Sequence, residues 1–347
     1  MVGCEADKII KQLDEAYTWI CCRRNRYSAN ADVWDLRFNW PDMKMEIIRQ
    51  LNTNTYDFDP VSTFWSGGKW IEMWSARDAL VLKALSLALT KDLSQVISRC
   101  CYHFKNRGGT KAAIRSIGWH CPNYRFFIKT DVKSYYASMD HLTILEICRK
   151  HIKNRLYISL IHSFLNRITY CRGQYTQATR GIPRGSSLSP VLGALYLHEL
   201  DCGFEKKKHL KYSRYMDDIL ILCRTRHQTG RIVKGLYQAF DRLKLSMARE
   251  KKAIGKTSKG FDFLEYHVRP NKIDISTQSI KKFTGRILER LYQPKADFCQ
   301  LFQYAGNWLR YFGSGLNKET FNKQKEDLNW KLKLSLNHNL MIALRMH

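Results

Sequence analysis

Apolar positions recur at helical spacing in the first part of the chain. They predict one helix over residues 9–17 and another over residues 45–51, so the first 60 residues are expected to be helical. Residues 78–89 (DALVLKALSLAL) are apolar almost throughout and contain neither glycine nor proline, which predicts a long buried helix. Glycine pairs within residues 67–68 and 106–110 predict loops between these elements.

The rest of the chain mixes strands and helices without repeats, low-complexity segments or a proline-rich linker, which predicts interwoven subdomains. Residues 212–222 form two short apolar runs around Met216-Asp217-Asp218, which predicts a strand, a tight turn and a second strand. Residues 181–190 contain two glycines and two prolines and predict a loop. Further strands are expected over residues 124–132, 261–268 and 272–275, and further helices over residues 141–165, 191–200, 229–243 and from residue 278 onward.

The composition adds a large positive charge to this pattern. The 347 residues include 58 Lys and Arg against 31 Asp and Glu, a formal net charge of +27, while a hydrophobic fraction of 44% argues against charge-driven disorder. Such a surplus attracts polyanions, and the chain has neither a run of 18 apolar residues nor a signal pattern at its start. We therefore expect a soluble, cytoplasmic protein that binds nucleic acid and no membrane.

The positive charge is concentrated in two regions. Residues 91–129 carry eight Lys and Arg against one acid, interleaved with aromatic side chains such as Tyr102 and Trp119. That mixture is typical of a groove that follows a nucleic acid backbone. Residues 269–347 carry fourteen Lys and Arg against six acids on a helical pattern, which suits a second wall of such a groove.

Three aspartates stand at the ends of apolar runs. Asp131 follows the apolar run Phe126-Phe127-Ile128 in the strand expected over residues 124–132, and Asp217 and Asp218 occupy the expected tight turn. Acids on an apolar hairpin are costly unless a Lys, an Arg or a divalent metal compensates them. The eleven cysteines include no C-x-x-C pair, so the oxygen ligands favour Mg²⁺ or Mn²⁺ over zinc. If the strands pair, Asp131 and Asp217 can hold two ions about 3.5–4 Å apart, with Asp218 as a supporting charge.

Taken in order, these segments resemble the motifs of reverse transcriptases. Residues 127–141 (FIKTDVKSYYASMDH) resemble the first catalytic motif, residues 181–201 the substrate-holding loop and helix, and residues 212–222 (YSRYMDDILIL) the second catalytic motif. The branch that they resemble comprises bacterial group II intron, retron and defence-associated (anti-phage) enzymes. Weaker similarity covers residues 74–85 and 103–114 in the fingers, residues 245–255 near the triphosphate and residues 260–268 at the primer grip.

The resemblance implies an α+β right-hand polymerase with fingers, a palm built on an antiparallel sheet, and a helical thumb. Since the chain ends at His347, we expect no maturase, endonuclease or ribonuclease H domain after the thumb. The implied regions are an N-terminal helical extension (1–64), fingers and palm elements (65–126 and 142–190), the palm with its catalytic motifs and primer grip (127–141 and 191–268), and the thumb (269–347).

The resemblance also implies roles for individual residues. Two ions, Mg²⁺ or else Mn²⁺, would be held by Asp131, Asp217, Asp218 and Val132, and Lys251 would assist the departing pyrophosphate, with Lys252 as a rival. Tyr136 would be the gate against ribonucleotides, unless Tyr135 takes that role. The other nucleotide-binding candidates are Lys69, Arg77, Arg184 and Gly185, and the primer-grip candidates are Phe261, Phe263 and Leu264.

Two positions depart from the family pattern. Arg184 stands in a P-R-G triplet where relatives commonly have P-Q-G, which puts a positive charge near the nascent base pair. Glu265 stands in the primer-grip segment where glycine is common, and the sequence offers no account of it. Lys69 and Arg77 fall where motif spacing is loose, so a simple solvated surface role stays open for both.

The leading functional hypothesis is synthesis of DNA on an RNA template, such as a dedicated non-coding RNA, from a DNA or RNA primer and dNTPs. Template-independent or protein-primed DNA synthesis is the second hypothesis, and a catalytically silent RNA-binding scaffold is the third. RNA synthesis is disfavoured by the bulky gate at Tyr136. A retron or anti-phage role is preferred, while an intron enzyme or a diversity-generating element stays open, and no oligomeric state is predicted.

Overall fold

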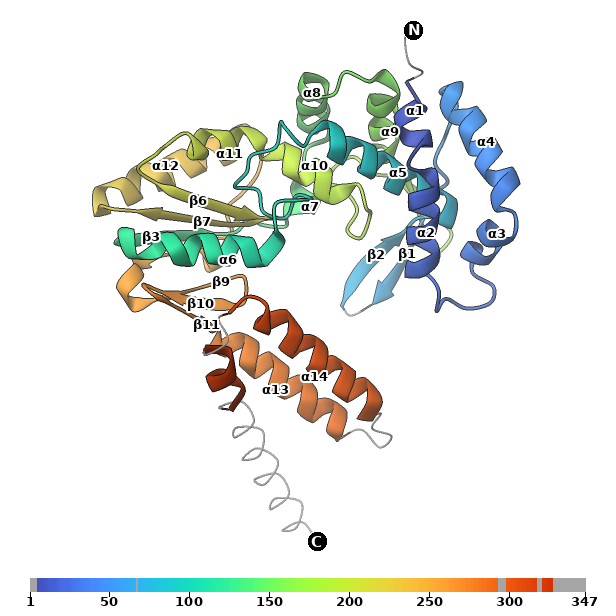
Figure 1. Cartoon of the computed structure of the whole chain (residues 1–347). Coiled ribbons are helices and arrows are strands. Elements are labelled where there is room, and N and C mark those ends of the chain that lie inside the picture. Colours follow the sequence, from blue (N-terminus) through green and yellow to red (C-terminus); the bar gives the residue numbers. More distant parts are fainter. Residues whose placement is uncertain (1–4, 67, 293–297, 317–319, 327–347) are drawn as a thin grey trace.

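The structure, a computed structural model of the chain, describes residues 5–66, 68–292, 298–316 and 320–326. Three antiparallel or mixed sheets are surrounded by helices, which confirms the α+β class. Figure 1 shows the N-terminal helices at one end of the molecule, an antiparallel sheet at the other, and the C-terminal helices projecting below. No helix in the described ranges is both long and apolar enough to cross a membrane.

Four N-terminal helices pack around one long central helix, α5 (Ala76–Asp92), as predicted for the first 60 residues and for residues 78–89. The hydroxyl of Ser75 caps α5 by accepting a hydrogen bond from the Asp78 N–H (3.1 Å), and apolar side chains around its whole circumference are buried. The surrounding helices are α1 (Asp7–Ile10), α2 (Leu13–Arg23), α3 (Asp32–Phe38) and α4 (Trp40–Asn52).

A sheet of two hairpins, which we call the fingers sheet, was not predicted. Gly68, with a φ of 75°, lies in the turn of one hairpin, and the two hairpins meet through a short parallel pairing of Val61 with Thr169 and of Ser62 with Tyr170. Exposed strands lack the alternation of burial that sequence patterns detect, which explains the omission. In the order β2-β1-β4-β5, the strands are β1 (Val61–Ser66), β2 (Lys69–Met73), β4 (Ile168–Cys171) and β5 (Gln174–Gln177).

A second sheet, which we call the palm sheet, is antiparallel throughout and has the order β6-β7-β3-β8. Leu220 and Leu222 of β7 pack toward α6 (Gly109–His120), whereas Ile219 and Ile221 pack toward α12 (Arg226–Arg242). Burial on both faces therefore makes this sheet the centre of the core. Its strands are β3 (Phe126–Thr130), β6 (Lys211–Tyr215), β7 (Asp218–Cys223) and β8 (Ala253–Lys256).

Helices join the two sheets, and two predictions about them are wrong. The helix expected over residues 141–165 is two helices, because Ile152 turns extended and the Asn154 side chain caps the second one by accepting from the Tyr157 N–H (3.1 Å). The helix expected over residues 191–200 is likewise divided. These connecting helices are α7 (Tyr135–Ser138), α8 (His141–His151), α9 (Arg155–Leu165), α10 (Ser189–Tyr196) and α11 (His198–Glu205).

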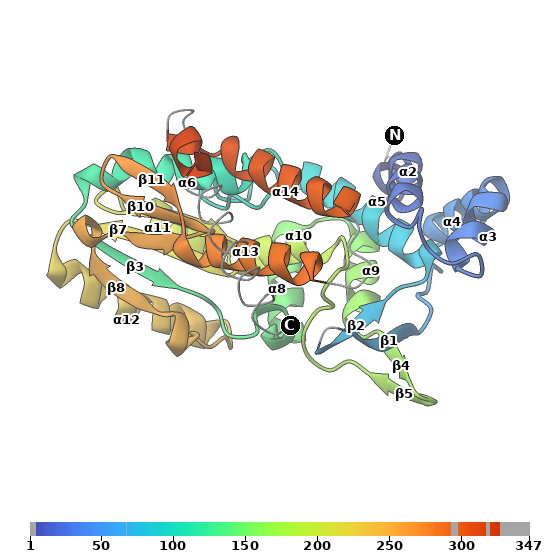
Figure 2. The same cartoon turned by 90° about the horizontal axis from the view of Figure 1, so that it is seen from below.

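The chain continues below the palm sheet with a small three-stranded sheet and the helical thumb (Figures 1 and 2). The strand expected over residues 261–268 is a hairpin, because Leu264 and Glu265 adopt positive φ angles of 48° and 71°. The elements are η1 (Cys121–Asn123), η2 (Arg249–Lys251), η3 (Thr257–Lys259), β9 (Phe261–Phe263), β10 (Tyr266–Arg269), β11 (Lys272–Ile275), α13 (Thr277–Leu291) and α14 (Phe298–Gly313). Residues 327–347 of the expected thumb lie outside the described residues.

Candidate active site

The palm sheet brings the three predicted aspartates to one edge. Asp131 directly follows β3, and Asp217 and Asp218 lie at the turn from β6 to β7. Because β3 and β7 pair antiparallel, with Thr130 opposite Ile219, the end of β3 lies beside this turn. Asp131 is 3% exposed, and its Oδ1 atom is buried without a hydrogen-bond partner.

Burial and mutual repulsion disfavour the charged forms of these acids. Burial, with the adjacent Asp131 carboxylate as the next cause, raises the pKa of Asp217 to about 6. The same two causes raise the pKa of Asp218. The aspartates therefore form a site with too little positive charge beside it to compensate all three, which favours binding of a cation.

One lysine partly compensates this charge. Lys251 Nζ donates a hydrogen bond to Asp131 Oδ2, and this bond raises the pKa of Lys251. Lys252 instead contacts Tyr237, with its Nζ 3.5 Å from the phenol oxygen. The structure thus places Lys251, and not its rival Lys252, at the carboxylates.

The oxygen atoms at this edge fit a hard divalent cation that is completed by a substrate. In the described part of the chain, no group of three or more His, Cys, Asp or Glu side chains forms a ready-made metal site. Mg²⁺ is usually bound by one or two carboxylates together with substrate phosphates, which matches Asp131 and Asp217. The Val132 carbonyl is a further available oxygen, because the backbone bridge to Met247 uses the carbonyls of Asp131 and Ser246.

The turn of Met216 and Asp217 between β6 and β7 carries the candidate metal ligands, and we call it the catalytic turn. A fully buried ion pair holds this turn from one side. The Arg214 guanidinium donates to both Asp201 oxygens at 2.5 and 2.7 Å, and the Tyr212 hydroxyl donates to Asp201 at 2.7 Å. Arg214 also donates to the Met216 carbonyl at 2.9 Å, one residue before Asp217. Neither member of the pair has exposed side-chain surface. Sequence reasoning missed both residues, since their pairing joins α11 to β6.

A buried histidine holds the same turn from the other side. The Met216 N–H donates to His103 Nδ1 at 2.9 Å, and His103 Nε2 lies 3.3 Å from the Pro190 carbonyl. Burial, reinforced by the charge of Arg214, lowers the pKa of His103 to about 3, so the ring is neutral and accepts through Nδ1. Met216 has a positive φ of 55°, so both of its backbone polar groups are fixed in a strained conformation.

The adjacent tyrosines have different surroundings. The Tyr136 hydroxyl lies 3.4 Å from Met216 Sδ at the catalytic turn, whereas the buried Tyr135 hydroxyl donates to the Gly193 carbonyl at 2.6 Å. Burial and the charge of Asp217 raise the pKa of Tyr136 to about 12, which keeps its phenol neutral. Tyr136 is therefore the tyrosine that faces the carboxylates, and Tyr135 belongs to the core.

Comparison with known proteins decides the family. The model of the family described as reverse transcriptase (RNA-dependent DNA polymerase) matches residues 75–268, which is more than half of the chain. The chain belongs to the reverse transcriptase family. This confirms the resemblance read from the motifs and the expected right-hand polymerase architecture.

Two curated relatives are associated with introns. The chain is 28% identical over 172 residues to an uncharacterized 91 kDa protein in the cob intron of Schizosaccharomyces pombe, covering 48% of this chain and 21% of that protein. It is 22% identical over 315 residues to the group II intron-encoded protein LtrA of Lactococcus lactis subsp. cremoris, covering 71% of this chain and 52% of LtrA. The chain thus spans between about a fifth and about half of the length of these relatives.

Among solved structures, apo telomerase from Candida tropicalis, truncated from its C-terminal domain, is similar at a TM-score of 0.46 and 13% identity. The similarity covers 56% of this chain and 45% of the telomerase chain.

In this reverse transcriptase, Arg184 and Gly185 line a hollow of about 650 Å³ between the loop of residues 181–190 and β2. Two other lining arginines are engaged: Arg167 pairs with Glu72 at 2.5 Å, and Arg180 donates to two backbone carbonyls. Arg184 has no ion pair among the described residues, which leaves its charge available to a ligand. Gly185 has a φ of 90°, a conformation that other residues rarely adopt.

Lys69 and Arg77 are the other two nucleotide-binding candidates, and no described contact brings either of them to the carboxylates. Arg77 donates to Gln50 at 2.5 Å and lies over the Tyr56 ring at 5.0 Å, so its contacts are with the N-terminal helices. Lys69 opens β2, and its side chain lies outside the described part of the structure. Their nucleotide-binding roles stay predictions.

The primer-grip candidates divide into a core and a turn. Phe261 and Phe263 are buried, and Phe261 stacks on Phe127 of the palm sheet with 4.6 Å between ring centroids. A primer contact here would therefore come from the turn at Leu264 and Glu265. The positive φ of Glu265 gives a physical reason why glycine suits this position, and the Glu265 carbonyl accepts from the Ser276 N–H at 2.9 Å.

Proposed function

We propose that the chain is an RNA-directed DNA polymerase, a nucleotidyltransferase that extends a DNA or RNA primer with dNTPs along an RNA template. The observation that carries the proposal is the adjacency of the buried Asp131 and the partly buried Asp217, two carboxylates with too little positive charge beside them, at the edge of the palm sheet. Membership of the reverse transcriptase family supports the same reaction.

The surrounding residues suit nucleotidyl transfer. Asp131, Asp217 and the Val132 carbonyl would hold divalent cations, with Asp218 beside them. Two Mg²⁺ or Mn²⁺ ions, when bound, would activate the primer hydroxyl and stabilise the leaving pyrophosphate. Lys251 would donate a proton to that pyrophosphate, a role that its hydrogen bond to Asp131 supports, and Arg184 would contact the triphosphate or the template.

The template is proposed to be a dedicated non-coding RNA, with anti-phage defence as the biological role. The net charge of +27 supports binding of an extended RNA, and the motif resemblance to retron and defence-associated enzymes supports the role. An intron RNA is the second candidate template, because the curated relatives are named as intron proteins.

The test is synthesis on a defined RNA. The purified protein receives a primed RNA of known sequence, Mg²⁺ and labelled dNTPs or NTPs, and the products are sequenced. We expect DNA complementary to the template, and loss of about 100-fold or more of this activity in Asp217→Asn, with Asp241→Asn on the exposed side of α12 as the matched control. Untemplated DNA would support the second hypothesis, and RNA binding without a product would support a silent scaffold.

Substrate choice tests the gate separately. Tyr136→Ala should raise ribonucleotide use relative to deoxyribonucleotide use by about 10- to 100-fold, because the ring faces the catalytic turn. Tyr135→Ala, which opens the core next door, should lower stability without changing this ratio. An unchanged ratio in Tyr136→Ala would remove the gate assignment.

A further inference from the structure

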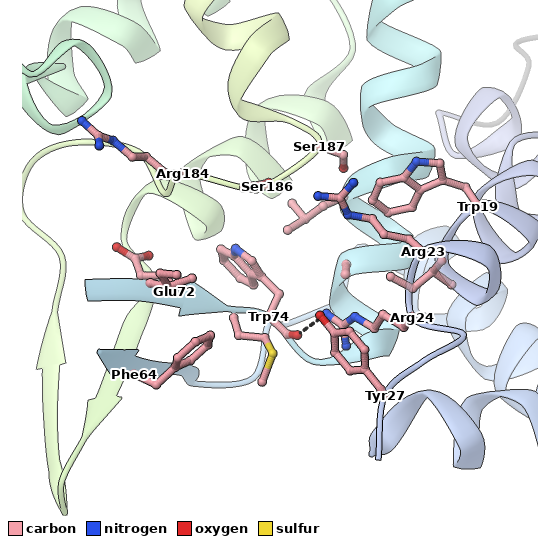
Figure 3. Close-up of a pocket in the computed structure, with 16 residues that line it drawn as sticks. Trp19, Arg23, Arg24, Tyr27, Phe64, Glu72, Trp74, Arg184, Ser186 and Ser187 are labelled. Carbon is pink, nitrogen blue, oxygen red and sulfur yellow. Dashed lines mark hydrogen bonds between the residues drawn. The ribbon is translucent and has the colours of Figure 1, made fainter. Parts of the chain in front are cut away.

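A small pocket lies between the N-terminal helices and the fingers sheet (Figure 3). Its volume is about 170 Å³, several times the roughly 30 Å³ share of one water and below the roughly 300 Å³ at which pockets for drug-sized molecules begin. The pocket therefore suits a single ring system. It adjoins the larger hollow of about 650 Å³, since Ile71, Glu72 and Arg184 line both.

The pocket walls combine aromatic rings with arginine. Trp19 and Tyr27 come from the N-terminal layer and Phe64 from β1, and the last two are 42% and 41% exposed. The Arg23 guanidinium lies 5.6 Å from the Trp19 ring centroid, and among the described residues no acid pairs with it. The acid that lines the pocket, Glu72, is already neutralised by Arg167. This setting attracts a planar group that carries negative charge.

Two polar atoms at the pocket lack partners. Trp74 is 5% exposed and stacks on Phe164 with 5.5 Å between ring centroids, yet its Nε1–H makes no hydrogen bond. Figure 3 shows the indole of Trp74 rising from the end of β2 into the space below the loop of Ser186 and Ser187. The Ser187 hydroxyl is also buried and without a partner. Buried donors are rarely left unsatisfied, so the pair points to a ligand with polar atoms on its edge.

We propose that this pocket holds one unpaired base of the template strand, ahead of the position being copied. The base would stack against Phe64 and Tyr27, its edge would meet Trp74 and Ser187, and Arg23 would contact the adjoining phosphate. The position follows from Arg184, a nucleotide-binding candidate that lines both this pocket and the larger hollow. The inference rests on the proposed function for the identity of the strand.

The test is equilibrium binding of primer–template duplexes that carry a single abasic site, moved one position at a time along the unpaired template. Fluorescence anisotropy without dNTPs should show one position at which the abasic site weakens binding by about 5- to 100-fold. Phe64→Ala and Trp74→Phe should abolish this position-specific loss. Phe38→Ala, on α3 outside the pocket and 90% exposed, should preserve it.

The controls keep the outcome decisive. Trp74→Phe keeps an aromatic ring against Phe164 and removes an N–H that makes no bond. Because the smaller ring leaves a cavity, its binding is measured well below its own melting temperature. A flat abasic profile in the unmodified protein, or a loss that both pocket variants retain, overturns the proposal. Free nucleoside monophosphate that cancels the loss would assign the pocket to a free nucleotide and overturn the strand assignment. Since no synthesis is needed, a protein that binds but does not polymerise contradicts only the proposed function, and one that binds no primer–template contradicts both.

Discussion

The catalytic turn and the fingers sheet are both built on antiparallel strands, but their polar and apolar groups are arranged in opposite ways. At the turn, Arg214 and Asp201 are fully buried and bonded to each other, and Met216 is held at both its N–H and its carbonyl. In the fingers sheet, Trp65, Trp70 and Tyr175 leave half or more of their surface exposed. The palm sheet thus fixes the carboxylates in one geometry, while the fingers sheet offers aromatic surface to ligands.

Breaking the buried pair of Arg214 and Asp201 should lower the stability of the fold more than any of the other substitutions. Asp201→Ala leaves the Arg214 charge buried and unpaired, so the free energy of unfolding should fall by about 3–5 kcal/mol in chemical denaturation. Lys150→Ala, which breaks an exposed pair with Glu199, should cost less than about 1 kcal/mol. If the two variants lose similar stability, the buried pair is not what sets the turn apart.

Asp78 is a buried acid that has no cation paired with it among the described residues, and it should make the free energy of unfolding depend on pH. Asp78 accepts from the Tyr56 hydroxyl at 2.7 Å and from the Asp59 N–H at 3.0 Å, and burial raises its pKa to about 6. The folded state then binds the proton more tightly than the unfolded state, so stability falls as pH rises from about 4 to about 6, by about 3 kcal/mol.

Asp217 and Asp218, whose pKa values are also raised, add to this slope of stability with pH. In denaturation measured across that range, Asp78→Asn should therefore reduce the slope by the share of Asp78, whereas Asp57→Asn, at an exposed acid, should leave it unchanged.

Loosening the turn should affect catalysis more than folding. His103→Ala removes the acceptor for the Met216 N–H, so synthesis should fall by about 10- to 100-fold, with a higher Mg²⁺ concentration needed for half-maximal rate. His103→Asn can place an acceptor in the same region and should restore part of the rate. Equal Mg²⁺ requirements in the alanine variant and the unmodified protein would show that the histidine does not position Asp217.

The exposed aromatic surface should contribute least to stability. Tyr175 on β5 is 66% exposed, so Tyr175→Ala should change the free energy of unfolding by no more than about 0.5 kcal/mol. Tyr212→Phe, which removes a buried hydroxyl from Asp201, should cost about 1–3 kcal/mol in the same denaturation assay. A larger loss at Tyr175 would mean that the fingers sheet depends on these rings for its own packing.

The same contrast explains what the sequence could predict. The palm strands and the buried helix α5 were expected because burial imposes a clear pattern, and the three aspartates were expected because each ends an apolar run. The fingers strands went unnoticed because their side chains are exposed, and the helix over residues 141–165 was expected to be continuous because Ile152 does not mark its break.

Side-chain partners far apart in sequence could not be inferred from one chain. His103 and Met216, or Asp201 and Arg214, become neighbours only through the pairing of segments that no local pattern specifies. The choices between Tyr135 and Tyr136 and between Lys251 and Lys252 needed geometry for the same reason, because adjacent residues of one type look alike in sequence. The family motifs located the site, and the folded chain showed what supports it.

The strand order of the palm sheet also has a consequence for synthesis on the ribosome. β3, which leads to Asp131, pairs with β7 and β8, and the first of these begins 88 residues after β3 ends. At about 5–20 residues per second, both edges of β3 lack their native partners for roughly 4 to 18 seconds. An apolar strand with two open edges invites pairing with other chains. Production of this protein should therefore be limited by aggregation of nascent chains, and slower initiation or added chaperone should raise the soluble yield.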